Sequence, residues 1–194
     1  RRYILETENK CAFVGSKGTS GNGTYSIKGV LDSSFYDSTG DIGKKEQVAA
    51  GVGGRTWAVK TAAEILTDLL TAVKYVEGDG LFKARALVLP PAQYTLLRQP
   101  YSTLNPMTLL DWLNSHGMYF EQIISSRVMK AANNGDGTND FFLVIDNDPE
   151  VIQMVLTYDI TMLNPVYDEL QTMKQAVMEG FGGVLFRHPA GAYI

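Results

Sequence analysis

Side chains that could act as a nucleophile or a general base are scarce in this chain. The only cysteine is Cys11 and the only histidines are His116 and His188. Cys11 has apolar neighbours on an expected helix, which is typical of a small core residue rather than a thiolate. His116 stands beside Gly117 at an expected helix end and His188 precedes Pro189, so nucleophilic catalysis is not indicated. One cysteine and two distant histidines also cannot complete a tetrahedral zinc site.

The stretch AAGVGGRT, residues 49–56, bears a superficial likeness to a phosphate-binding loop before a helix. It departs from that motif because Arg55 replaces the lysine that reaches the phosphates and Ala49 replaces the first glycine. In addition, residues 44–47 do not have the pattern of a buried strand. A flexible linker is the better interpretation, and a small-ligand or nucleotide-binding α/β enzyme that uses residues 51–56 is an alternative.

Two turns, residues 133–140 and 146–148, offer oxygen ligands for a hard cation. Neither fits a calcium loop, since aligning Asp136-Gly137 with positions five and six puts Ala132 first and Leu143 last, where carboxylates are needed. Solvated turns are therefore favoured. Two carboxylates that act in acid–base catalysis can be far apart in the sequence, because they need only be close in space. The sequence therefore does not indicate which carboxylates could form such a pair. We predict no catalytic, cofactor-binding or metal-binding residues, no cofactor and no enzymatic activity.

The composition is that of an ordinary globular chain. Its 194 residues are 45% hydrophobic and 20% charged, and no apolar run approaches the roughly 20 residues of a membrane-spanning helix. The 17 basic and 21 acidic residues give a net charge of −4, and no basic cluster is longer than a pair. Sequence-specific nucleic-acid binding and membrane insertion are therefore not expected.

The clearest elements lie between Trp57 and Leu97. Thr61 and Glu64 form a capping box, and apolar residues then recur at helical spacing, which predicts a helix that ends at Gly78. Its buried face is expected to hold Ile65, Leu66, Leu69, Leu70, Val73 and Val76, and its opposite face Glu64, Thr67, Asp68 and Thr71. Residues 86–89 are predicted to form a strand covered on both faces, and Pro91 is predicted to begin another helix.

The remaining elements are expected on both sides of this segment. A helix over residues 3–13 closes at Gly15, and residues 15–54 form a long Gly-rich region with a brief strand near residues 25–28. Asn105 caps and Pro106 begins a helix that ends at Gly117.

Strands are expected in the second half of the chain. Those at residues 123–128 and 141–145 are predicted to form a hairpin across the polar turn. Further strands are expected at residues 151–156, 172–178 and 184–186. Because Arg1-Arg2 leads straight into a helical pattern without an initiator methionine or a signal peptide, we expect a fragment of a longer polypeptide.

The order and spacing of these pieces resemble a known family. The segments that carry the resemblance are ETENKCAFVG (6–15), ALVLPPAQY (86–94), TLLDWL (108–113), the strand at residues 141–146 and GGVLFRHPA (182–190). Together they resemble the C-terminal two-thirds of a major capsid protein of a tailed bacteriophage, whose fold is shared with encapsulin shell proteins. The resemblance implies an α+β tailed-phage capsid fold. It places the end of a spine helix and an extended region of the peripheral domain at 1–56, an axial domain with a mixed sheet flanked by helices at 57–164, and C-terminal strands returning to the peripheral domain at 165–194.

The same resemblance implies a structural function. Copies of the chain would associate with one another into the pentamers and hexamers of an icosahedral shell around phage double-stranded DNA, with portal, scaffold or decoration proteins as further candidate partners. The protein would then be found in the virion, after assembly in the cytoplasm of the bacterial host. An encapsulin-like nanocompartment shell is the related alternative. A chain without a recognisable catalytic constellation suits either shell, since specificity in such proteins lies in large surfaces repeated by symmetry.

Overall fold

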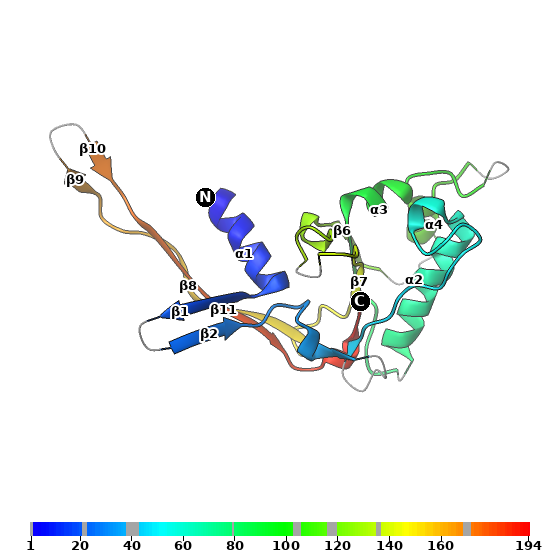
Figure 1. Cartoon of the computed structure of the whole chain (residues 1–194), viewed down its shortest axis with the longest axis horizontal. Helices are drawn as coiled ribbons and strands as arrows, with labels where there is room; N and C mark the ends of the chain where they lie inside the picture. Colours follow the sequence, from blue (N-terminus) through cyan, green and yellow to red (C-terminus); the bar gives the residue numbers. More distant parts are fainter. Residues whose placement is uncertain are drawn as a thin grey trace. The chain divides into compact units, whose positions relative to one another are not determined.

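The computed structural model of the chain describes residues 2–20, 23–37, 43–78, 80–102, 106–115, 120–134, 137–168 and 172–194. Contacts within the chain divide it into two compact units. Unit 1 comprises Arg1–Val30 and Gln153–Leu185, and unit 2 comprises Leu31–Ile152 and Phe186–Ile194. Each unit therefore combines two segments that are far apart in the sequence, which can be followed by colour in Figure 1.

These limits differ from the expected boundaries at residues 56 and 164. Residues 31–56 pack with unit 2, and residues 153–164 pack with unit 1. The assignment of an axial and a peripheral domain to particular residues stays a prediction.

Unit 2 is built around a mixed sheet of six strands in the order β3-β4-β12-β7-β5-β6. The strands are β3 (Tyr36–Asp37), β4 (Gly43–Lys44), β5 (Ala86–Leu89), β6 (Gln122–Ser125), β7 (Leu143–Ile145) and β12 (Ala192–Tyr193). β5 pairs parallel with β6 and antiparallel with β7. β12 pairs antiparallel with β7 and parallel with β4, and β3 pairs parallel with β4. The last residues of the chain therefore lie inside the sheet rather than at its edge.

Helices complete unit 2. They are α2 (Ala62–Glu77), α3 (Pro91–Leu96) and α4 (Leu109–Ser115), with short 3-10 turns at Ser33–Phe35, Trp57–Val59, Arg127–Met129 and Pro189–Gly191. α2 packs on β7 and β12. Its buried side chains join those of β5 and β7 in one core, whose largest fully buried members include Leu69, Leu87, Leu89, Leu97 and Leu109. Burial of each such side chain contributes roughly 1.5 to 3 kcal/mol.

The expected helix–strand–helix segment is confirmed in its main features. Thr61 and Glu64 form the capping box, and Gly78 caps the C-terminus of α2. All four residues of β5 are buried, and Pro91 is the first residue of α3.

The predicted faces of α2 were wrong at two positions. Asp68 is 7% exposed and Leu70 is 37% exposed. Asp68 is buried because it accepts a hydrogen bond from Trp57 Nε1 at 2.9 Å and pairs with Lys60 Nζ at 2.5 Å. These polar partners precede the helix, so the buried stripe of α2 extends toward Asp68 and away from Leu70.

The expected hairpin between residues 123–128 and 141–145 was also wrong. β5 lies between β6 and β7 in the sheet and pairs with both. Val128 belongs to a 3-10 turn rather than to the strand, and its N–H donates a hydrogen bond to Ser126 Oγ at 3.4 Å.

The expected helix start at Pro106 needs correction as well. α4 begins at Leu109, because the Thr108 hydroxyl accepts from Asp111 N at 3.0 Å and donates to Asp111 Oδ2 at 2.6 Å. The proposed cap Asn105 and the proposed stop Gly117 lie outside the described residues.

Unit 1 contains α1 (Arg2–Val14), a hairpin of β1 (Ser16–Ser20) and β2 (Gly23–Ile27), and a two-stranded ribbon of β8 (Ile152–Met162) and β11 (Val177–Phe186), with β9 (Val166–Asp168) paired to β10 (Thr172–Lys174). The expected first helix and its closure at Gly15 are confirmed, with φ 82° at that glycine. The Gly-rich region holds more regular structure than the one brief strand expected near residues 25–28, because it begins with the β1–β2 hairpin. A side chain at Gly29 would collide with the Phe13 carbonyl, so the return of the chain past α1 requires glycine there.

The expected strands of the C-terminal region have different limits in the structure. The strand expected at 151–156 extends to Met162, and the one expected at 172–178 is divided between β10 and β11. β8 and β11 run antiparallel, since Gly180 approaches Tyr158 while Gly182 approaches Val155. Figure 1 shows them side by side as a long ribbon.

Candidate functional site

The residues first considered for catalysis do not form a site in the described part of the chain. Cys11 is half-buried in α1, whereas His188 is exposed beside the Phe82 ring, with 6.1 Å between ring centroids. His116 lies outside the described residues. Among the residues that the structure describes, no group of three or more histidine, cysteine, aspartate or glutamate side chains could hold a metal ion.

The Gly-rich stretch at 49–56 is not a flexible linker. It is a turn held in place by hydrogen bonds, and is named the tied turn. Gly51 and Gly54 exchange backbone hydrogen bonds of 2.8 and 3.2 Å. Arg55 Nη1 donates to the Val48 carbonyl at 2.8 Å, and Val52 N donates to Glu64 Oε1 at 2.8 Å. An amide that a phosphate would need is therefore already bonded to a carboxylate of the same chain, which argues against the nucleotide-binding alternative.

The carboxylate of Glu64 holds this turn and caps α2 at the same time. It accepts from Thr61 N at 2.7 Å, from Thr61 Oγ1 at 2.9 Å and from Val52 N. Hydrogen bonds from the Thr61 and Val52 amides, followed by the one from the Thr61 hydroxyl, lower the pKa of Glu64 below its ordinary value of 4.5.

This lowered pKa predicts a pH dependence of stability. A carboxyl whose pKa is lower in the folded state stabilises the fold above the unfolded pKa, and this contribution disappears as the pH falls through the folded pKa. We expect the parent to exceed Glu64→Gln in melting temperature at pH 6, and the difference to shrink when the pH falls below 4.5. Circular dichroism melts of both proteins from pH 6 to pH 3 provide the measurement. A difference that stays constant over this range would contradict the assigned role of the Glu64 charge.

In the two turns considered for cations, Asp140, Asp146 and Asp148 are engaged in contacts within the chain. Asp146 is buried and accepts from Lys83 N at 3.0 Å, and Arg85 lies between it and Asp148, with N–O distances of 3.4 and 3.1 Å. The expectation of a solvated turn was therefore wrong for Asp146. Asp140, in the other turn, accepts from Gln93 Nε2 at 2.8 Å and from Ala131 N at 2.9 Å.

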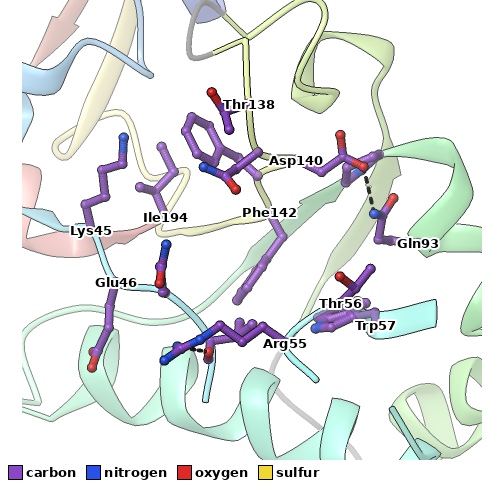
Figure 2. A pocket seen from close by; sticks show the side chains of 15 residues that line it. Lys45, Glu46, Arg55, Thr56, Trp57, Gln93, Thr138, Asp140, Phe142 and Ile194 are labelled. Atoms are coloured by element: carbon purple, nitrogen blue, oxygen red, sulfur yellow. Dashed lines mark hydrogen bonds between the residues drawn. The ribbon is translucent and has the colours of Figure 1, made fainter. Parts of the chain in front are cut away.

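A hollow of about 640 Å³ lies on unit 2 between the tied turn and the 137–142 segment. Figure 2 shows the Phe142 ring projecting into it, with Asp140 and Gln93 on one side and Arg55 on the other. Trp57 and Phe142 pack at a centroid distance of 5.4 Å, so the wall of the hollow is aromatic. Its volume falls within the range of about 300 to 1,000 Å³ typical of ligand clefts.

Exposed apolar side chains gather on the β8–β11 ribbon of unit 1. Tyr158 is 59% exposed and Met162 is 67% exposed. Met154, Val155 and Leu156 are consecutive and all exposed. Successive strand residues point to opposite faces, so apolar side chains are exposed on both faces of the ribbon. A two-stranded ribbon is marginally stable by itself, and exposed apolar surfaces of this kind are typical of protein–protein or membrane contact sites.

This exposed surface was not predicted from the sequence. Its signal was the absence of alternation: a strand with one face in a core alternates apolar and polar residues, whereas residues 154–156 are all apolar. Such a run is equally typical of a strand buried on both faces, and the sequence does not show that only one partner strand is present.

None of the described helices combines the length and the apolar character needed to cross a membrane. The mixed sheet with flanking helices and the apolar ribbon form an α+β fold, which is of the phage-capsid type by its similarity to a solved capsid. A solved structure described as the capsid of Myoviridae phage XM1 is similar to this chain with a TM-score of 0.71 and 12% sequence identity, and the match covers 99% of this chain and 63% of that one. A virus-like particle from Pyrococcus furiosus is similar with a TM-score of 0.56 and 20% identity, over 78% of this chain and 55% of that one.

The family follows from the sequence itself. The model of the major capsid protein family matches residues 1–193, and the chain belongs to that family. The expected resemblance and the expected fold class are thereby confirmed. The comparison with curated proteins finds no match. The chain spans less than two thirds of the length of the two capsid-type chains described above.

Proposed function

We propose that copies of this protein associate into pentamers and hexamers of a closed icosahedral shell, and that this shell encloses the double-stranded DNA of a bacteriophage. The protein is then a structural component of the virion, assembled in the host cytoplasm, and catalyses no reaction. Membership of the major capsid protein family supports this proposal. Portal, scaffold or decoration proteins are candidate partners of the shell.

The observation that carries the proposal is the exposed apolar ribbon β8–β11. Met154, Leu156 and Tyr158 are spaced by two and therefore share one face, while Val155 lies on the other. Contact with a neighbouring copy would remove these side chains from water, at about 25 cal/mol for each Å² of apolar area. Apolar side chains are exposed on both faces of the ribbon, so each subunit can contact more than one neighbour, as a closed lattice requires.

A nanocompartment shell that encloses proteins is the second candidate, because the Pyrococcus furiosus neighbour is a virus-like particle and not described as a phage. The content of purified particles separates the two. If the protein is a phage capsid, the ratio of nucleic-acid to protein absorbance should show DNA in particles from the native source. Mass spectrometry of the same particles identifies any enclosed proteins. Protein cargo without DNA would favour the nanocompartment.

Assembly can be tested by placing charges on the ribbon. The double variant Met154→Lys, Leu156→Lys puts two ammonium groups where neighbouring copies would make apolar contact. Burying unpaired charges costs several kcal/mol, so the protein concentration at half-assembly should rise at least about a hundredfold. Electron microscopy and light-scattering mass of the full-length protein measure this shift.

Leu81→Lys is the matched control, since Leu81 is 79% exposed and belongs to unit 2 rather than to the ribbon. We expect the control to assemble at the same concentration as the parent. A strictly monomeric parent at high concentration would contradict the proposed function, and equal assembly of parent and ribbon variant would contradict the role of the ribbon.

A further inference from the structure

The first strand of the apolar ribbon has the composition of an interface core between proteins. Residues 152–167 contain a single charged residue, Asp159, whereas 20% of the whole chain is charged. The exposed side chains of this stretch include Met154, Tyr158 and Met162. Depletion of charge, with enrichment in aromatic residues and methionine, distinguishes the core of a protein–protein interface from the rest of a protein surface. A stretch without a basic residue also does not attract the phosphates of nucleic acids or anionic lipids, so another protein is the favoured partner.

Tyr158 differs from the other exposed residues of this stretch. Its side chain is 59% exposed, and in the described part of the chain it is the only aromatic one among the large apolar side chains that are exposed. A tyrosine covers a large area with only two rotatable bonds, and tyrosine is one of the residue types that dominate the binding energy of protein interfaces. The methionines beside it have three rotatable bonds and lose more conformational entropy when they are covered. Tyr158 therefore has the properties of an anchor residue.

A glycine of the partner strand makes room for the Tyr158 ring. A Cβ atom at Gly180 of β11 would collide with Cδ2 of Tyr158, so only glycine lets the ring lie this close to the backbone of β11. Glycine inside a strand weakens it and often marks a place where another group approaches the backbone closely. Contact with β11 limits the orientations of the ring before a partner arrives, and a preorganised side chain loses less entropy on binding.

From these observations we propose that Tyr158 is the anchor residue through which the ribbon contacts a second copy of this chain, and that Gly180 positions its ring for this contact. The partner is a second copy because the chain belongs to the major capsid protein family, and this choice rests on the proposed shell function. The ring enters an apolar surface of the neighbouring copy, while the exposed side chains of Met154 and Leu156 exclude water around it.

Photo-cross-linking at position 158 tests the contact directly. Benzoylphenylalanine replaces Tyr158 in the full-length protein, which keeps an aromatic ring at this position, and the purified protein is irradiated under assembly conditions. We expect a product of two covalently joined chains, with the attachment at residue 158 identified by mass spectrometry. The same protein irradiated below its assembly concentration is the control and should not give this product. Assembled particles without an intermolecular product at residue 158 would overturn the proposal.

Substitutions of Tyr158 give an independent test. Tyr158→Ala removes the ring, so we expect at least about a tenfold higher protein concentration for half-assembly. Tyr158→Phe retains the ring and should stay within about threefold of the parent. Met162→Ala is the matched control, since Met162 is 67% exposed on the same strand, and its effect should also stay within about threefold. Equal effects of Tyr158→Ala and Met162→Ala would show that the ribbon has no anchor residue at position 158.

The role of Gly180 is tested by a double-mutant cycle. Gly180→Ala displaces the Tyr158 ring without removing it, so the protein concentration for half-assembly should rise at least about fivefold. In the Tyr158→Ala background the same change should have little effect, because no ring remains to be displaced. Effects that simply add would show that Gly180 acts through the ribbon backbone and would contradict its positioning role. Circular dichroism melts identify any variant that does not fold, and the cross-linking result does not depend on these variants.

The outcomes separate this inference from the proposed function. If the parent assembles and the variant Met154→Lys, Leu156→Lys does not, but Tyr158→Ala assembles like the parent, the shell function holds and the anchor residue is wrong. If the parent does not assemble at all, the proposed function itself fails.

Discussion

Replacing Asp68 by alanine is expected to lower the free energy of unfolding by about 3 to 5 kcal/mol. The side chains of Lys60 and Asp68 are 1% and 5% exposed, so the substitution leaves an ammonium group buried without its counter-charge. Trp57 Nε1 loses its acceptor in the same step. Urea denaturation of the dissociated protein, followed by circular dichroism, measures the change.

The double variant Lys60→Met, Asp68→Leu is the control for this interpretation. It removes both charges and fills their space with apolar atoms, a replacement that is often neutral or stabilising for buried ion pairs. Because Trp57 Nε1 remains without an acceptor, we expect the double variant to stay about 1 to 3 kcal/mol below the parent. If Asp68→Ala alone remains within about 1 kcal/mol of the parent, Lys60 reaches water and the pair is not a buried one.

Leu87→Ala is the second substitution with a large expected effect, of about 2 to 5 kcal/mol. Leu87 is 0% exposed, and its strand β5 lies between β6 and β7 in the sheet. Removing its side chain opens a cavity in the core of unit 2 that the paired strands cannot close without breaking their hydrogen bonds. Urea denaturation again provides the measurement.

Leu81→Ala removes the same atoms from a side chain that is 79% exposed. Its expected effect stays within about 0.5 kcal/mol, as for most exposed substitutions. If Leu87→Ala and Leu81→Ala lowered the free energy of unfolding equally, burial in the core of unit 2 would not determine how much each leucine contributes to stability.

Local patterns in the sequence were sufficient where the determining contacts are close in the chain. The Thr61–Glu64 capping box, the four-residue strand β5 and the start of α3 at Pro91 were all predicted, since a cap or a fixed φ angle acts within one helical turn. The start of α4 was predicted wrongly although its cap is local. Asn105 and Thr108 are both residue types that cap helices, so the sequence did not choose between them. In the structure, the Thr108 hydroxyl accepts the hydrogen bond from the first turn of the helix, at Asp111 N.

The sequence also identified the family through the order of weak motifs, and the match over residues 1–193 confirms that identification. It indicated no constellation for catalysis, cofactor binding or metal binding, and those absences stay predictions. The tied turn at 49–56 was misjudged as a flexible linker, because its glycines are compatible with many conformations and the hydrogen bond from Val52 to Glu64 spans twelve residues.

The sequence by itself therefore determined the local elements and the family of this protein, whereas the tertiary structure decided how the elements pair and which side chains they leave exposed. Strand order is an example: β7 pairs with β5 across more than 50 residues, and no pattern within either strand specifies its neighbour. Burial of Asp68 likewise required the approach of Lys60 and Trp57. The apolar ribbon and the hollow of unit 2 arise in the same way, because exposure depends on what the rest of the chain covers.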